Sequence, residues 1–199
     1  MKRMARVAGL VFLIGAVGVA GYLVGIWHTG ATTAPIARAS SPDRDDLRTM
    51  YEQDQADRSG GIGHTDWAAI EPRDRTRRER ARALVGDGLV TTANDYYRAA
   101  MILQHGNQPE DFILAHDLAV VGAINGQRDA RWLAAATEDR FLRAVGRAQR
   151  FGTQFRKDGD GPWYLESVQA GVPDVLRVAM DVPPLAEAAS RVAEMNKSK

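Results

Sequence analysis

Residues 7–27 contain no charged side chain, and this stretch constrains the chain more than any other feature. As a helix, 21 residues rise roughly 30 Å, which matches the hydrocarbon core of a bilayer. Lys2, Arg3 and Arg6 precede the stretch, and this predicts a cytoplasmic N-terminus and an exported remainder. We therefore predict that residues 1–28 form a cytoplasmic tip and a single-pass signal anchor in a bacterial inner membrane.

A cleaved signal peptide is the alternative interpretation. Ala37-Arg38-Ala39 has the small-x-small form of a cleavage site. However, the apolar stretch is longer than the ~7–15 residues of a signal core, so we favour an uncleaved anchor. Both interpretations place the rest of the chain outside the cytoplasm.

Three glycines in the uncharged stretch bear on association in the membrane. Gly18, Gly21 and Gly25 are one turn apart and would let two anchor helices approach closely, which predicts a homodimer. Glycine is also common in membrane helices, and we favour this simpler explanation.

Composition limits the remainder of the chain. Residues 29–44 are small and polar, and we predict a flexible linker followed by an extracytoplasmic domain at 45–199. The hydrophobic fraction of 45% supports a packed core. The absence of cysteine excludes disulfides, thiolate zinc sites and thiol catalysis. A net charge of +1 gives no argument for nucleic acid, and we predict no such partner.

The first part of the predicted domain contains two helical segments. Residues 45–58 have apolar side chains at helical spacing. Residues 71–88 carry six arginines and three acids between Glu71 and Arg82. This run would suit phosphate or anionic lipid. Arginines and acids at helical spacing equally indicate a solvated helix, and we favour that interpretation.

Three consecutive helices form the best-defined part of the sequence. Their predicted ranges are 91–106, 108–126 and 129–146. Thr92 and Asp95 resemble a capping box at the start of the first of these helices. Because the connections are short, neighbouring helices must pack antiparallel. We therefore predict a mainly α fold in which a transmembrane helix precedes an antiparallel helical domain.

The C-terminal part has weaker patterns. Residues 158–161 predict a turn, and 162–170 a short strand or an extended arm. A final helix is expected after Pro183-Pro184.

Several polar side chains lie on helix stripes that we expect to be buried. An unpaired buried polar group costs roughly 1–3 kcal/mol, so these side chains should find partners. Neighbours in a helix point about 100° apart, so Asp139 and Arg140 need different partners. The group consists of Gln104, His105, His116, Asp139 and Arg140, with Gln149, Thr153 and Gln154 in the segment that follows.

A catalytic interpretation uses the same residues. A histidine beside a carboxylate can act as general acid or base, with His105 or His116 as the base and Asp139 orienting it. A hydrogen-bonded structural role is the favoured alternative for each histidine. The candidate substrate-binding residues are Gln104, Arg140, Gln149, Thr153, Gln154, Asp54 and Arg58.

We predict neither a metal ion nor a cofactor. Two histidines and an aspartate are a familiar ligand set for a divalent metal. However, the chain has no HExxH motif, and the eleven-residue spacing of His105 and His116 is not a recognised ligand spacing.

Four motifs in residues 45–156 resemble those of an uncharacterised bacterial family. That family is a helical domain of unknown function with DQxxR, QH, DR and Q-aromatic-GTQ elements. The resemblance implies that these polar residues belong together, and it implies no activity. The matching residues here are Asp54-Gln55 with Arg58, Gln104-His105, Asp139-Arg140, and Gln149 with Phe151-Gly152-Thr153-Gln154.

Two functions remain open from the sequence. One is a binding or scaffold module at the cell envelope that holds a peptide or protein partner. The other is an envelope hydrolase or transferase that uses the His/Asp/Arg/Gln polar cluster. Helical pairs are common recognition surfaces, which favours the first.

Overall fold

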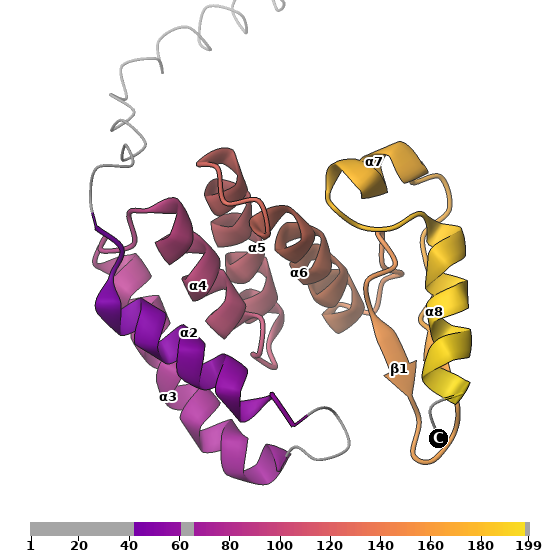
Figure 1. The fold of residues 1–199 in the computed structure, drawn as a ribbon, viewed down its shortest axis with the longest axis horizontal. Helices are drawn as coiled ribbons and strands as arrows, with labels where there is room; N and C mark the ends of the chain where they lie inside the picture. The colour runs from indigo at the N-terminus through magenta and orange to yellow at the C-terminus, as the bar shows by residue number, and fades with distance from the viewer. Residues whose placement is uncertain (1–41, 61–65, 198–199) are drawn as a thin grey trace, which may run out of the picture. The chain divides into compact units, whose positions relative to one another are not determined.

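The computed structural model describes residues 42–60 and 66–197, and this part of the chain is mainly helical, as predicted (Figure 1). A short two-stranded sheet follows the first five helices and precedes the last two. The helices are α2 (Asp45–Asp57), α3 (Trp67–Gly86), α4 (Ala93–Leu103), α5 (Pro109–Ile124), α6 (Ala130–Ala144), α7 (Asp174–Ala179) and α8 (Leu185–Lys197); the strands are β1 (Phe155–Lys157) and β2 (Trp163–Leu165).

The predicted membrane anchor at 1–28 lies outside the described residues, as does most of the predicted linker. Within 42–60 and 66–197, no helix combines the length and apolar character needed to cross a bilayer. The end of the predicted linker at 29–44 is held by α4: Thr92 Oγ1 donates to Asp43 at 2.8 Å, and the Arg44 N–H donates to Asp95 at 2.9 Å.

Helices α4, α5 and α6 pack side by side as an antiparallel layer (Figure 1). Gly122, near the end of α5, faces the starts of both neighbours: a Cβ added there would lie 3.4 Å from Ala130 Cβ and from Tyr97 N. Small side chains therefore allow the three axes to come close. The core of this part includes Leu47, Leu84, Ala99, Ile102, Leu103, Ala115, Leu118, Ala119, Leu133 and Ala134.

The capping box predicted at the start of α4 is confirmed. Thr92 Oγ1 accepts the Asp95 N–H at 3.0 Å, and the Asp95 carboxylate accepts the Thr92 N–H at 3.4 Å. Two of the backbone donors that a helix start leaves unpaired are thereby satisfied.

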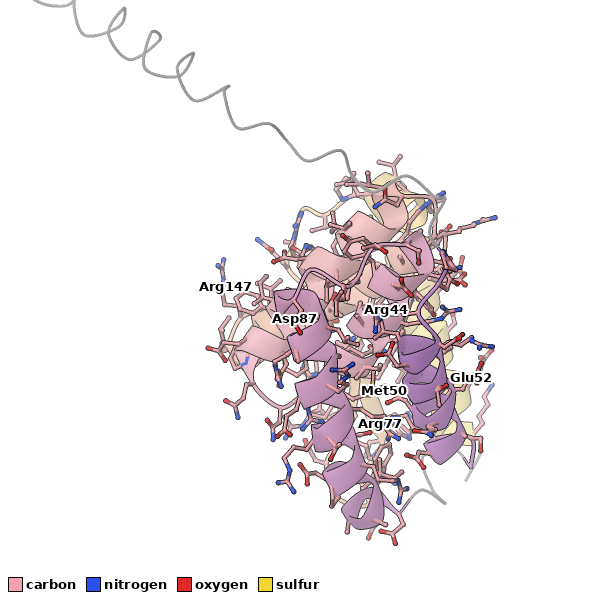
Figure 2. All side chains as sticks on the ribbon, turned by 90° about the vertical axis from the view of Figure 1, so that its left-hand side faces the viewer. Arg44, Met50, Glu52, Arg77, Asp87 and Arg147 are labelled. Atoms are coloured by element: carbon pink, nitrogen blue, oxygen red, sulfur yellow. The ribbon has the colours of Figure 1, made fainter. Side chains whose placement is uncertain are left out.

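The prediction of a solvated arginine-rich helix is wrong for one face of α3. Arg77 and Arg78 are only 5% and 7% exposed, because Ile70, Ala81 and Leu84 of the same helix draw that face into the core. Figure 2 shows Arg77 between α2 and α3.

The C-terminal part forms a hairpin covered by a helix. Strands β1 and β2 pair antiparallel, with Phe155 opposite Leu165, and the predicted turn at 158–161 joins them. Helix α8 packs on β2, where Asn196 donates to the Trp163 carbonyl at 3.0 Å and accepts the Trp163 N–H at 2.8 Å. Strand β1 and helix α7 were not predicted.

Candidate functional site

The segment after α6 is held to Asp139 by four hydrogen bonds. One carboxylate oxygen accepts the N–H groups of Arg150 at 2.6 Å and Phe151 at 2.9 Å. The other accepts the N–H of Thr153 at 3.0 Å and its hydroxyl at 2.8 Å. Asp139 is fully buried, so these donors replace the water that a carboxylate requires.

Arg177 of α7 binds the carbonyl groups of the same segment. Its guanidinium donates to Phe151 O at 3.1 Å and to Arg150 O at 3.0 Å, and it also contacts Val172 O. The N–H groups of residues 150–151 therefore donate to the Asp139 carboxylate, and their carbonyl groups accept from the Arg177 guanidinium. Arg177 was not predicted, because a single arginine in a six-residue helix has no distinguishing pattern.

The two predicted glutamines pair with each other and with nearby backbone. Gln149 Nε2 donates to Gln154 O at 3.0 Å and Glu166 O at 2.9 Å, and its Oε1 accepts the Gln154 N–H at 2.9 Å. Gln154 Nε2 donates to Ala136 O at 3.3 Å. We call Asp139, Gln149, Thr153, Gln154 and Arg177 the loop lock, because their polar groups hold the segment between α6 and β1.

A separate cavity of about 520 Å³ is formed by the end of α2, by α3, by the link after α4 and by α6. We call it the arginine pocket. Sequence analysis selected three of its residues, Arg58, His105 and Arg140, but not the α3 residues. The pattern that could have identified the α3 residues is their helical spacing, as in Ile70, Asp74 and Arg78. The lining consists of Arg58, Trp67, Ile70, Glu71, Asp74, Arg78, His105, Gly106, Asn107 and Arg140.

An ion-pair network next to the pocket is electrically balanced. Arg58 donates to Asp54 Oδ1 at 2.9 Å and also pairs with Asp74. Arg77 lies 2.6 Å from a carboxylate oxygen of Asp74 and 2.6 Å from one of Asp57. The network's three guanidinium groups and three carboxylates are those of Arg58, Arg73, Arg77, Asp54, Asp57 and Asp74.

Two further guanidinium groups are not balanced in this way. Arg78 Nη1 donates to His105 O at 3.1 Å, and its Nη2 lies 3.8 Å from a carboxylate oxygen of the half-exposed Glu71. Arg140 has no hydrogen bond or ion pair with any described residue, and its Nε is buried. Burial, followed by the nearby charges of Arg143 and Arg58, lowers the pKa of Arg140 to about 10. Arg140 therefore stays cationic at neutral pH.

The structure separates the three predicted catalytic residues. His105 Nε2 is buried 3.4 Å from Asp54 Oδ2 and has no hydrogen bond to any residue that the structure describes. His116 lies outside the pocket lining, where its Nδ1 is 2.9 Å from Ala134 O. Asp139 belongs to the loop lock, so the carboxylate that faces His105 is Asp54 instead. Gln104 is also buried, and its amide contacts Met101 Sδ at 3.1 Å.

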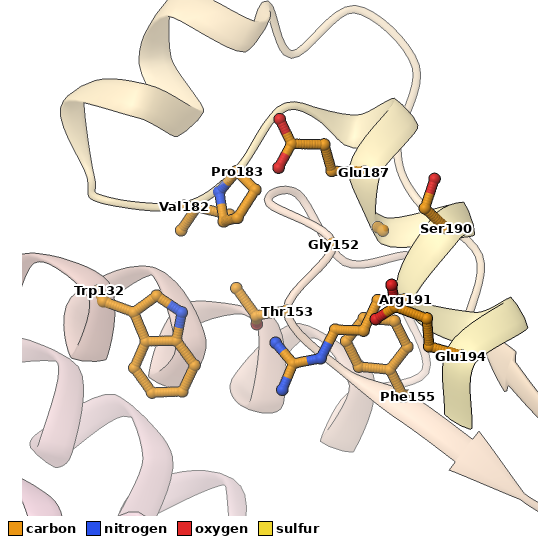
Figure 3. Close-up of a pocket in the computed structure, with 11 residues that line it drawn as sticks. Trp132, Gly152, Thr153, Phe155, Val182, Pro183, Glu187, Ser190, Arg191 and Glu194 are labelled. Carbon is orange, nitrogen blue, oxygen red and sulfur yellow. The ribbon is translucent and has the colours of Figure 1, made fainter. Parts of the chain in front are cut away.

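A second hollow of about 320 Å³ lies between α6, the segment 151–155 and α8 (Figure 3). Trp132 and Phe155 contribute aromatic rings to its wall, and the Arg191 guanidinium carbon lies 5.5 Å from the Phe155 ring centre. Glu187 and Glu194 add negative charge, so the wall carries both signs. Thr153 also lines this hollow, although its polar groups are engaged in the loop lock.

No family model, curated protein or solved structure matches this chain.

Proposed function

We propose that the helical domain is a binding module whose ligand is an anionic small molecule held in the arginine pocket. The observation that carries this proposal is Arg140, a cationic side chain with no counter-ion among the described residues. A buried charge without a partner is costly, and a bound anion would remove that cost.

Unsatisfied nitrogen atoms support the same proposal. Buried polar atoms in native proteins are nearly always hydrogen-bonded, so an exception needs an explanation. Among the described residues, buried side-chain nitrogens without a partner include Arg58 Nε, His105 Nε2 and Arg140 Nε, and these three residues line one cavity. Guanidinium groups also match the geometry of carboxylate and phosphate oxygens.

We also propose that the domain lies at the cell envelope. The uncharged stretch at 7–27 supports a single-pass anchor and an extracytoplasmic domain at the envelope. The resemblance to the uncharacterised helical family implies that its motif residues belong together. Among them, Arg58 contacts Asp54, Asp54 lies near His105, and Asp139 binds Thr153. A peptide or protein partner would then be bound through an anionic group.

Thermal unfolding of the full chain tests the proposal. We expect phosphate, sulfate or acetate to raise the midpoint above that in chloride at equal ionic strength, because a ligand of the folded state stabilises it. Arg140→Gln should abolish the rise. Arg147→Gln is the control, because Arg147 is exposed and outside the pocket lining. Equal midpoints in every anion would refute the proposal.

An envelope hydrolase or transferase is the second candidate, favoured by the buried His105 Nε2, which lies 3.4 Å from Asp54 and has no hydrogen bond within the described part of the chain. In this version His105 serves as the acid or base and Asp54 orients it. The candidate predicts turnover of a chromogenic ester that His105→Gln abolishes. If the wild type binds anions but does not turn over the ester, the enzyme candidate fails and the binding module stands.

A further inference from the structure

We infer that the ligand of the arginine pocket is a phosphate monoester whose organic part is planar and lies against Trp67. This inference rests on the proposed anion binding and names the class of anion. It follows from the charge left over in the pocket, from the size of the cavity and from the position of one exposed aromatic ring.

The leftover charge suits a dianion. Three guanidinium groups of the adjacent network are matched by three carboxylates, which leaves Arg78 and Arg140. Arg140 has no counter-ion among the described residues, and Arg78 has only the distant, half-exposed Glu71. A phosphate monoester carries about −1.5 to −2 charges at pH 7, whereas a carboxylate carries one. Glu71 is shared with Arg75, whose Nη1 lies 4.0 Å from it, so a dianion comes closer than a carboxylate to balancing Arg78 and Arg140.

The cavity is larger than an inorganic anion requires. Its volume of about 520 Å³ falls in the range of roughly 300–1,000 Å³ that is typical of small-molecule sites. Trp67 and Ile70 lie in the first turn of α3, and Arg78 lies about two turns further along the same helix. A ligand that fills the cavity therefore has a charged end and an apolar end.

Trp67 provides the surface for the apolar end. It opens α3 and shares a stripe with Ile70, Asp74 and Arg78, at intervals of three and four residues. Its side chain is 52% exposed, although tryptophan usually covers its large apolar surface. A planar group stacked on the indole would cover it while the phosphate contacts Arg78 and Arg140.

Calorimetric titration of the full chain with phenyl phosphate, inorganic phosphate and benzoate tests this inference. Stacking on an aromatic side chain strengthens binding about five- to 150-fold, so phenyl phosphate should bind at least about fivefold tighter than phosphate. Benzoate should bind more weakly than phenyl phosphate, because it carries one charge. Trp67→Leu should lower the affinity for phenyl phosphate to that for inorganic phosphate.

The control variant is Trp132→Leu, which removes a partly exposed indole from the second hollow and should leave all three affinities unchanged. A nucleoside monophosphate and phosphotyrosine carry the same phosphate chemistry on a planar ring, and tight binding of either supports the inference and identifies its source. Tight binding of vesicles with phosphatidic acid, but of neither ring-bearing phosphate, would overturn it, because the organic part of that lipid is not planar. If benzoate and phosphate bind but phenyl phosphate binds no tighter than inorganic phosphate, the inference fails and the proposed anion binding stands. If no anion binds, both proposals fail.

Discussion

Asp139 and Arg140 are neighbours on α6, but their side chains belong to different sites. The Asp139 carboxylate accepts four hydrogen bonds from residues 150–153, whereas the Arg140 guanidinium lines the arginine pocket without a partner among the described residues. One helix therefore fixes the adjoining segment with one residue and presents a positive charge to the cavity with the next. The two residues should respond to mutation in opposite ways.

Asp139→Asn should destabilise the fold by about 3 kcal/mol, because hydrogen bonds to a buried charge are lost and an amide N–H₂ would face backbone N–H groups. The measurement is the urea midpoint of the full chain. Glu138→Gln is the matched control: Glu138 also contacts Arg150, but this pair is partly exposed and should contribute less than about 1 kcal/mol. Equal midpoints for Asp139→Asn and wild type would rule out the loop lock.

Arg140→Met should not destabilise the protein without ligand, and should raise its free energy of unfolding by on the order of 1 kcal/mol. Methionine keeps most of the side-chain volume and removes a partly buried charge that has no counter-ion in residues 42–60 and 66–197. Urea unfolding in chloride buffer measures the change. A loss of several kcal/mol would show that Arg140 has a structural partner, contrary to this account.

Arg58→Met is expected to have the opposite effect. Its guanidinium contacts Asp54 and Asp74, both nearly fully buried, and removing it leaves uncompensated charge in the interior. Breaking a buried ion pair in this way costs roughly 3–5 kcal/mol. The same urea experiment checks it, and a value equal to that of Arg140→Met would contradict the charge balance described above.

Gly106→Ala should destabilise the protein by roughly 1–3 kcal/mol, because an added Cβ would lie 2.1 Å from an Asp111 carboxylate oxygen and would push on the start of α5. Gly86→Ala is the control. Nothing lies within 4 Å of a Cβ added there, and its φ is not positive, so alanine should be neutral or stabilising by up to ~1 kcal/mol. Equal unfolding midpoints would contradict the close approach at Gly106.

Acid should weaken the contact between α2 and α3 through Asp46. Hydrogen bonds from Arg44 at 2.9 Å and Arg80 at 3.1 Å lower the pKa of Asp46 to about 2, against about 3.9 in the unfolded chain. The lowered value means that the stabilisation is present above pH ~4 and is lost as the pH falls towards ~2. The stability advantage of wild type over Asp46→Asn should therefore shrink across this window. A constant difference would contradict the assignment.

Helix positions were predictable because local signals determine them. Thr92 with Asp95, Pro109, and the glycines after α4 and α5 mark ends that the structure reproduces within a few residues. Asp139, Gln149 and Gln154 were also expected to find buried partners, and they did. These predictions needed only helical spacing and the cost of an unpaired polar group.

The division between lock and pocket was not predictable, because it depends on how distant helices pack. Arg78 and Trp67 join His105 and Arg140 only once α3 lies against the link after α4. Counting charges in residues 71–88 suggested a solvated helix, since it ignored the apolar stripe that buries Arg77 and Arg78. Arg177 owes its burial to the carbonyl groups of a segment 26 and 27 residues earlier in the chain.

The most direct test of the central claim is calorimetric titration of inorganic phosphate into the full-length wild type, Arg140→Met and the exposed control Arg147→Met. We expect saturable binding to wild type and to Arg147→Met, and an affinity at least about tenfold lower for Arg140→Met, because a charged hydrogen-bond donor is removed. Equal affinities of wild type and Arg140→Met, or no binding to either, would contradict it.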